Sequence, residues 1–108
     1  MNDQNESATT HLARDAYLPL LNCKFRVGVG SEREFDAELI KVSKLRSNPY
    51  QQQFSLLFLF PLEEPVQQQM YEIRHESLGE FPLFLVPVAQ DDKGTVYQAV
   101  FNRLIDQA

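Results

Sequence analysis

Cysteine and histidine are almost missing from this chain, which has one Cys and two His among its 108 residues. A single cysteine excludes a disulfide within the chain and a thiolate metal cluster built from one chain. Cys23 falls on the apolar face of an expected strand, where a thiol behaves as a small hydrophobic group. His11 and His75 do not have the spacing of metal ligands. We therefore expect no metal, no cofactor and no disulfide.

The chain also lacks a block of Lys and Arg and a long apolar run. Its net charge is -5, and phosphate binding needs a clustered cationic surface, so we expect no nucleic acid and no anionic membrane as partner. No apolar stretch approaches the roughly 18 residues of a membrane-spanning helix, and the acidic N-terminus does not resemble a signal peptide. With the single cysteine, these absences predict a cytoplasmic protein.

The motifs of familiar enzyme classes are absent too. Ser55 and Ser77 lie outside any Gly-x-Ser-x-Gly elbow. Asp91 and Asp92 lack the later oxygen ligands of an EF-hand, and a hairpin turn accounts for them. Gly28 begins a Gly-x-Gly without the third glycine of a dinucleotide-binding loop. We therefore assign no catalytic residue and expect no enzyme.

Aromatic and aliphatic residues are what the chain has in quantity. Hydrophobic residues make up 44% of it, with 8 Phe and 4 Tyr, which is typical of a folded protein with an aromatic core. The length fits one domain. Residues 1–9 are polar and without periodicity and are expected to form a disordered tail, which leaves residues 10–108 as a single β-rich domain.

One short helix is expected at the start of this domain. Apolar residues recur there at helical spacing: Leu12, Ala16, Tyr17, Leu20 and Leu21. Pro19 removes a hydrogen bond and disfavours helix at Leu18, so the helix should break there and resume as a single turn. Asn22 can adopt the left-handed conformation that ends it.

Alternating polarity predicts six strands after the helix. They cover residues 23–29, 35–45, 52–60, 70–75, 83–88 and 95–101. The apolar phase of the second strand changes near Leu39, which predicts a bulge. The run Phe54–Phe60 is apolar on both faces, so both should be covered, one of them by the helix. Pro82 and Pro87 bracket the fifth strand, which should lie at an edge or have one unpaired side near Pro87.

These elements predict a mainly β fold, α+β by strict count. No connection after residue 22 is long enough for a crossover helix, so the strands should be antiparallel. We expect a curled six-stranded meander sheet or small barrel with the short N-terminal helix packed on it, or else a compact sandwich.

Several stretches also carry a family resemblance: Phe54–Phe58, Gln69–His75, Leu78–Gly79, Leu83–Val88 and Tyr97–Arg103. Together they resemble an uncharacterised family of small bacterial domains, over roughly residues 17–103. The resemblance implies a domain without assigned activity whose relatives occur beside genes for phage-tail-collar-like proteins. Asn22 and Phe60 depart from the family pattern, since glycine is expected at both positions.

Two functions of different classes follow as hypotheses. The first is a non-catalytic protein-interaction or assembly module, which binds another protein or itself through an exposed edge such as Leu83–Val88 and is associated with phage-tail-like structural proteins. The alternative is a small-ligand-binding domain or enzyme with an aromatic-lined cavity in the curled sheet. Tyr71, His75 and Tyr97 would be the polar members of that cavity.

Overall fold

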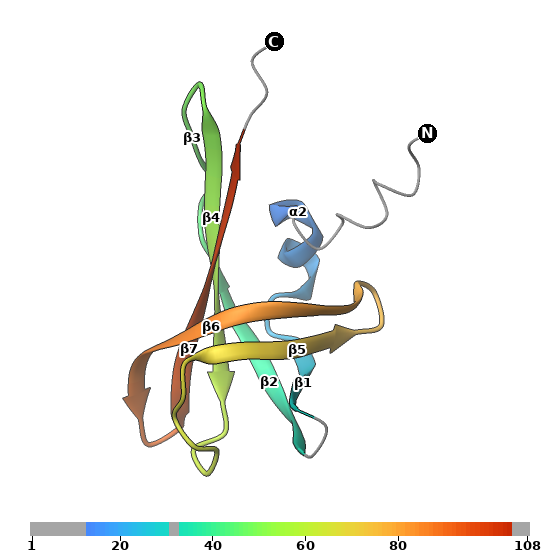
Figure 1. Cartoon of the computed structure of the whole chain (residues 1–108), viewed down its shortest axis with the longest axis vertical. Helices are drawn as coiled ribbons and strands as arrows, with labels where there is room; N and C mark the ends of the chain where they lie inside the picture. Colours follow the sequence, from blue (N-terminus) through green and yellow to red (C-terminus); the bar gives the residue numbers. More distant parts are fainter. Residues whose placement is uncertain (1–12, 31–32, 105–108) are drawn as a thin grey trace.

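The structure, a computed structural model, describes residues 13–30 and 33–104. Its elements are α2 (Arg14–Tyr17), the 3-10 helix η2 (Leu18–Leu20), β1 (Lys24–Val29), β2 (Arg33–Val42), β3 (Arg46–Ser47), β4 (Gln51–Phe60), β5 (Gln69–His75), β6 (Gly79–Asp91) and β7 (Gly94–Leu104) (Figure 1). The expected tail over residues 1–9 lies outside the described residues, as do His11 and Leu12. Neither described helix has the length and apolar character needed to cross a membrane.

Six strands close into an antiparallel barrel. Each strand pairs with the next in the order β1, β2, β4, β7, β6, β5, and β5 returns to β1, while the two-residue β3 extends the sheet beside β4. The prediction of a mainly β barrel with one short helix is confirmed. The meander order is wrong, because β5 follows β4 along the chain but lies between β1 and β6. The connection over residues 61–68 can span about 26 Å when extended, enough to carry the chain past two neighbouring strands.

The conformational preferences of single residues account for the helix break, the end of the helical segment and the bulge in β2. The helix changes to 3-10 geometry at Leu18, with Pro19 in its first turn. Asn22 has a positive φ of 72° and ends the helical segment, as predicted. The pairing of β2 with β4 shifts register between Leu39 and Lys41, which confirms the predicted bulge.

Strand β4 presents its aromatic side chains to the barrel interior. Phe54, Phe58 and Phe60 are buried, whereas Leu57 and Leu59 on the outer face are only half-buried. The helix was expected to cover this outer face, and that prediction is wrong. Tyr17 instead packs inside, with its ring centroid 6.3 Å from that of Phe54, so the helix closes the interior side of the barrel.

The direction of backbone groups in β4 follows from its contact with β2. The N–H of Ser43 donates to the backbone oxygen of Ser55 at 2.9 Å, so Ser55 points its backbone groups toward β2. Ser55 lies opposite Val100 of β7. Because these groups alternate along an antiparallel strand, Val100 must point its own away from β4, and so must Gln98, two residues earlier. The backbone N–H and C=O of Gln98 therefore point toward β6.

This alternation explains the two prolines of β6. The first half of β6 pairs with β5 and the second half with β7. Val86 lies opposite Gln98, and its backbone N–H and C=O point toward β7. Pro82 is four residues before Val86, so its nitrogen points to the same side. The first half of β6 has no described partner on that side. Pro87 points to the β5 side, which is unpaired there. Leu83–Val88 is therefore not an edge strand, although each proline faces an unpaired side.

Gly94 begins β7 where its backbone touches β4. Its φ is 154°, and a Cβ there would overlap the backbone oxygen of Phe60 and lie 3.2 Å from Cδ1 of Leu59. No side chain fits without moving the β6–β7 turn away from β4. The turn depends on glycine at this position for space as well as for conformation.

We predict that Gly94→Ala lowers the free energy of unfolding by about 3 kcal/mol or more, because a positive φ and a backbone overlap both oppose the new methyl group. Gly79→Ala is the matched control, since Gly79 also has a positive φ, 81°, but nothing within 4 Å of its Cβ position. It should cost only about 1–2 kcal/mol. Urea unfolding of both variants measures the difference, and equal costs would contradict the overlap at Phe60.

Candidate functional site

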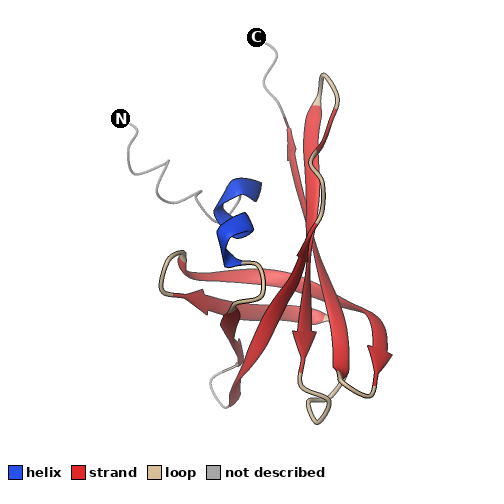
Figure 2. Cartoon of the chain, turned by 180° about the vertical axis from the view of Figure 1, so that it is seen from behind, coloured by secondary structure: helices blue, strands red, loops and turns tan. Residues whose placement is uncertain are grey.

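The barrel opens where β6 leaves β7. Pairing between these strands ends at Gln98, and residues 99–104 of β7 pair only with β4 among the described strands. We call the projecting part the arm: β3, residues 51–55 of β4 and residues 99–104 of β7. It rises beyond the barrel in Figure 1, and in both views the end of β7 is on the side of the arm that faces α2 (Figures 1 and 2).

The outer edge of β7 in the arm offers free backbone groups. Val100, Asn102 and Leu104 lie opposite Ser55, Gln53 and Gln51. By the alternation described above, all three point their N–H and C=O away from β4, toward the open side. Val100 is 54% exposed and Leu104 is 81% exposed. On the other side of the opening, Pro82 leaves the edge of β6 without one donor.

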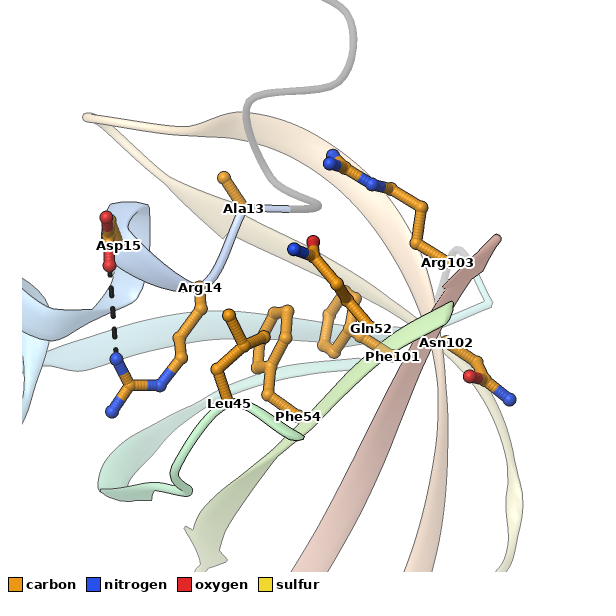
Figure 3. A pocket seen from close by; sticks show the side chains of 9 residues that line it. All are labelled: Ala13, Arg14, Asp15, Leu45, Gln52, Phe54, Phe101, Asn102 and Arg103. Atoms are coloured by element: carbon orange, nitrogen blue, oxygen red, sulfur yellow. Dashed lines mark ion pairs between the residues drawn. The ribbon is translucent and has the colours of Figure 1, made fainter. Parts of the chain in front are cut away.

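A pocket of about 240 Å³ lies between the arm and α2. Figure 3 shows its lining residues: Ala13, Arg14, Asp15, Leu45, Gln52, Phe54, Phe101, Asn102 and Arg103. Its floor is formed by Phe54 and Phe101, whose rings are stacked with centroids 4.6 Å apart and planes within 2° of parallel. Both residues are almost completely buried, at 6% and 8% exposure, so neither ring offers a free face to solvent.

Arginines from two elements border this pocket. Arg14 Nε donates to the backbone oxygen of Ser43 at 2.6 Å, which ties α2 to the segment between β2 and β3. Its Nη1 is 3.9 Å from Asp15, a loose contact. Arg103 has no ion pair within residues 13–30 and 33–104, and its side chain lies on the same face of β7 as Phe101 (Figure 3). The pocket is thus apolar at its floor, and the charged residues at its rim are two arginines, Arg14 and Arg103, and one acid, Asp15.

Charge on the barrel is paired, unlike charge on the arm. Glu34 accepts hydrogen bonds from Arg26 at 3.0 Å and from Arg74 at 2.8 Å. These two guanidinium groups hold the pKa of the Glu34 carboxyl below its usual value. Asp36 also accepts from Arg26, at 3.1 Å. The surface around β1, β2 and β5 therefore has cations and anions in contact.

The arm and the strands that lead into it carry cations without acids. Residues 39–62 contain three cations and no Asp or Glu, and residues 94–105 contain Arg103 as their one charged residue. Lys41, Lys44 and Arg46 border an outer concavity of about 650 Å³ and have no ion pair among the described residues. Although the whole chain has a net charge of -5, this end of the molecule is positive.

The structure brings together two of the three ligand-binding residues predicted from sequence. The rings of Tyr71 and Tyr97 meet edge to face, 5.8 Å apart. Tyr71 donates its hydroxyl hydrogen to the oxygen of Gln67 at 2.6 Å, and the N–H of Gln67 donates to the hydroxyl of Tyr97 at 2.9 Å. Both hydroxyls thus hold the 61–68 connection against the barrel. Their binding of a ligand stays a prediction.

His75 lies apart from this pair. It is four residues beyond Tyr71 on β5, about 13 Å along the strand. Its ring packs against Phe25 with centroids 4.7 Å apart, and its Nδ1 accepts a hydrogen bond from the N–H of Ser77 at 3.0 Å. That bond places the proton of the neutral ring on Nε2. His75 thus contacts the core and the β5–β6 turn rather than the two tyrosines.

The other sequence candidates have structural contacts. Asp91 accepts a hydrogen bond from the N–H of Lys93 at 2.8 Å inside the hairpin turn. Cys23 is partly buried against the core. Outside these candidates, Glu64 in the 61–68 connection forms an ion pair with Arg33 at 3.0 Å. In the described part of the chain, no three His, Cys, Asp or Glu side chains gather as metal ligands would.

The comparisons with known proteins give a family and no activity. Residues 12–101 match the family model of a domain of unknown function, DUF6916. No protein of curated function and no solved structure matches the chain.

Burial raises the pKa of Tyr71 to about 12, which predicts an alkaline loss of stability. Unfolding exposes the phenol and returns its pKa to about 10, so the unfolded state releases the proton first as the pH rises. The contribution of Tyr71 is therefore complete below about pH 10 and is lost between about pH 10 and 12. Burial of Tyr17 raises its pKa as well and adds to the same decline.

Tyr71→Phe should make this decline shallower without abolishing it. Urea unfolding of both proteins at about pH 9 and about pH 11.5 gives the two slopes. Unfolding at about pH 7 gives separately the cost of losing the hydrogen bond to Gln67, about 1 kcal/mol. Identical slopes in the wild type and Tyr71→Phe would show that the buried phenol of Tyr71 does not contribute.

Proposed function

The chain belongs to the DUF6916 family, a domain family of unknown function. We propose that it is a non-catalytic protein-interaction module that binds an extended segment of a partner protein by strand addition to the open edge of β7. The observation that carries this proposal is the set of free backbone groups at Val100, Asn102 and Leu104. They stand beside a partly apolar pocket on an arm that projects from the barrel.

An unpaired strand edge favours binding of another strand, because each added backbone hydrogen bond replaces one to water in a row that is already ordered. In the arm, β4 pairs with β7 along its whole length and Phe54 stacks on Phe101, so the edge is held by contacts within the chain itself. A partner strand would therefore meet a preformed edge, and only its own segment would lose conformational entropy on binding.

The resemblance seen in the sequence suggests a setting for this module. In that setting, the partner would be a phage-tail-like structural protein, and this domain would join it as a small non-catalytic part of a larger assembly. A partner of this kind would supply the added strand, and the barrel would act as the rigid support of the edge. Self-association is the other arrangement to be tested.

Val100→Pro should weaken partner binding about tenfold or more while leaving the fold intact. The N–H of Val100 is not part of the β4 ladder, so proline removes a donor only from the open edge. The residue before it, Ala99, is already extended, as proline requires. A photo-crosslinking residue at Asn102, introduced into the full chain in its native host, reports the contact. We expect crosslinking to one partner to fall about tenfold or more, the loss that corresponds to about 1.4 kcal/mol.

Val100→Ala is the matched control, because it removes the side chain and keeps the N–H, and it should retain the crosslink. A second crosslinking residue at exposed Glu72 on β5 controls for random collisions. The melting temperature and far-UV circular dichroism of each variant check the fold. The proposal is wrong if the Asn102 crosslink survives Val100→Pro in a folded protein, or if it never exceeds that from Glu72.

A further inference from the structure

Side chains of β7 alternate between the two faces of the arm, and an added strand would place its own side chains beside those on the same face. Phe101 and Arg103 lie on the pocket side of the arm, opposite Phe54 and Gln52. Val100 and Asn102 alternate to the outer side. In an added strand, the residues opposite Phe101 and Arg103 would lie on the pocket side as a pair two positions apart. The two positions meet different surroundings.

The position opposite Phe101 is beside the pocket. A volume of about 240 Å³ is larger than the cavity of about 150 Å³ that accepts benzene in another protein. The floor of stacked Phe54 and Phe101, with Leu45 beside it, is apolar. A large apolar side chain of the partner would bury its surface there, whereas a polar one would lose hydrogen bonds to water without replacement.

The position opposite Arg103 is beside an unneutralised cation. Opposite charges on directly facing residues of neighbouring strands stabilise a sheet, and like charges destabilise it. The wider field acts in the same direction, since residues 39–62 and 94–105 carry only cations. On the barrel, by contrast, Arg26 and Arg74 already have carboxylate partners. An Asp or Glu is the residue that this position selects.

Charge also decides between a partner protein and a second copy. The antiparallel pairing of two arms would bring together two copies of residues 99–104, which contain no Asp or Glu, so no residue of the facing strand would neutralise Arg103. Residues 1–12 and 105–108 do not carry the sequence that these two positions select either. In residues 1–12 and 105–108, no Asp or Glu is followed two positions later by a large apolar residue.

A nucleic acid is disfavoured by the aromatic groups. Binding of single strands uses exposed ring faces on which bases stack. Phe54 and Phe101 are stacked on each other and almost completely buried, so neither offers a free face.

We infer that the captured strand belongs to a partner protein and runs antiparallel to β7 with the pattern Asp/Glu-x-apolar. The acid lies opposite Arg103 and a large apolar residue, two positions later, lies opposite Phe101 at the pocket. The acid comes first because the two strands run in opposite directions. This inference rests on the proposed function and specifies its partner.

The test is a selection from a display library of random segments about ten residues long, enough for one strand, against the full-length protein. Segments carrying Asp/Glu-x-Phe, Tyr, Leu or Ile should be enriched. Arg103→Glu should weaken the best synthetic peptide about fivefold or more, and changing the acid of that peptide to Lys should restore binding to Arg103→Glu. Lys93→Glu, an equal change of charge at the distant β6–β7 turn, should have little effect.

The outcomes separate the inference from the proposed function. Enriched segments without an acid at this position, whose binding is still lost in Val100→Pro, would overturn the inference and leave strand addition standing. Peptide binding that persists in a folded Val100→Pro variant would overturn both. An oligothymidylate that displaces the selected peptide and fails to bind Arg103→Glu would identify a nucleic-acid site and overturn the partner-protein assignment.

Discussion

The ladder between β4 and β7 is the constraint on which the rest of the molecule depends. It joins ten residue pairs without a register shift, from Gln51 and Leu104 to Phe60 and Thr95. At one end the ladder is sealed by the close approach of Gly94 to Phe60, and toward the other end Tyr17 packs its ring 5.8 Å from that of Phe101. Because β6 covers only the first half of β7, the same ladder that closes the barrel also produces the arm.

Local features of the fold were predictable because they depend on neighbours in sequence. The helix break at Leu18, the left-handed Asn22 and the bulge after Leu39 follow from the conformations that each residue allows. The strand order did not follow, because residues 61–68 can reach several strands. For β6 the prolines left two alternatives, an edge strand or one unpaired side near Pro87, and the structure has the second. A proline reveals only an unpaired nitrogen, and a strand that changes partners midway has unpaired sides just as an edge strand does.

The candidate site was hidden for a different reason. Tyr71 and Tyr97 attracted a ligand-binding interpretation as polar aromatic residues, yet their hydroxyls hold the 61–68 connection. The arm could have been suspected from the absence of Asp and Glu in residues 39–62. Net charge conceals that absence, since a total of -5 says nothing about where the charges gather. Only the pairing of β4 with β7 brings Arg103 beside the cationic segment.

The two edges that flank the opening differ in a way that a mere gap in the barrel does not explain. On β6, Pro82 points its nitrogen into the opening and interrupts the row of donors, a common protection against unwanted strand pairing. On β7, Val100, Asn102 and Leu104 leave the row complete. Cations on the arm make pairing between two copies unfavourable, and they attract an acidic strand by the same charge. Charge protects the β7 edge from a second copy of the arm, whereas a proline would protect it from every strand. The β7 edge can therefore still bind an acidic strand of a partner protein.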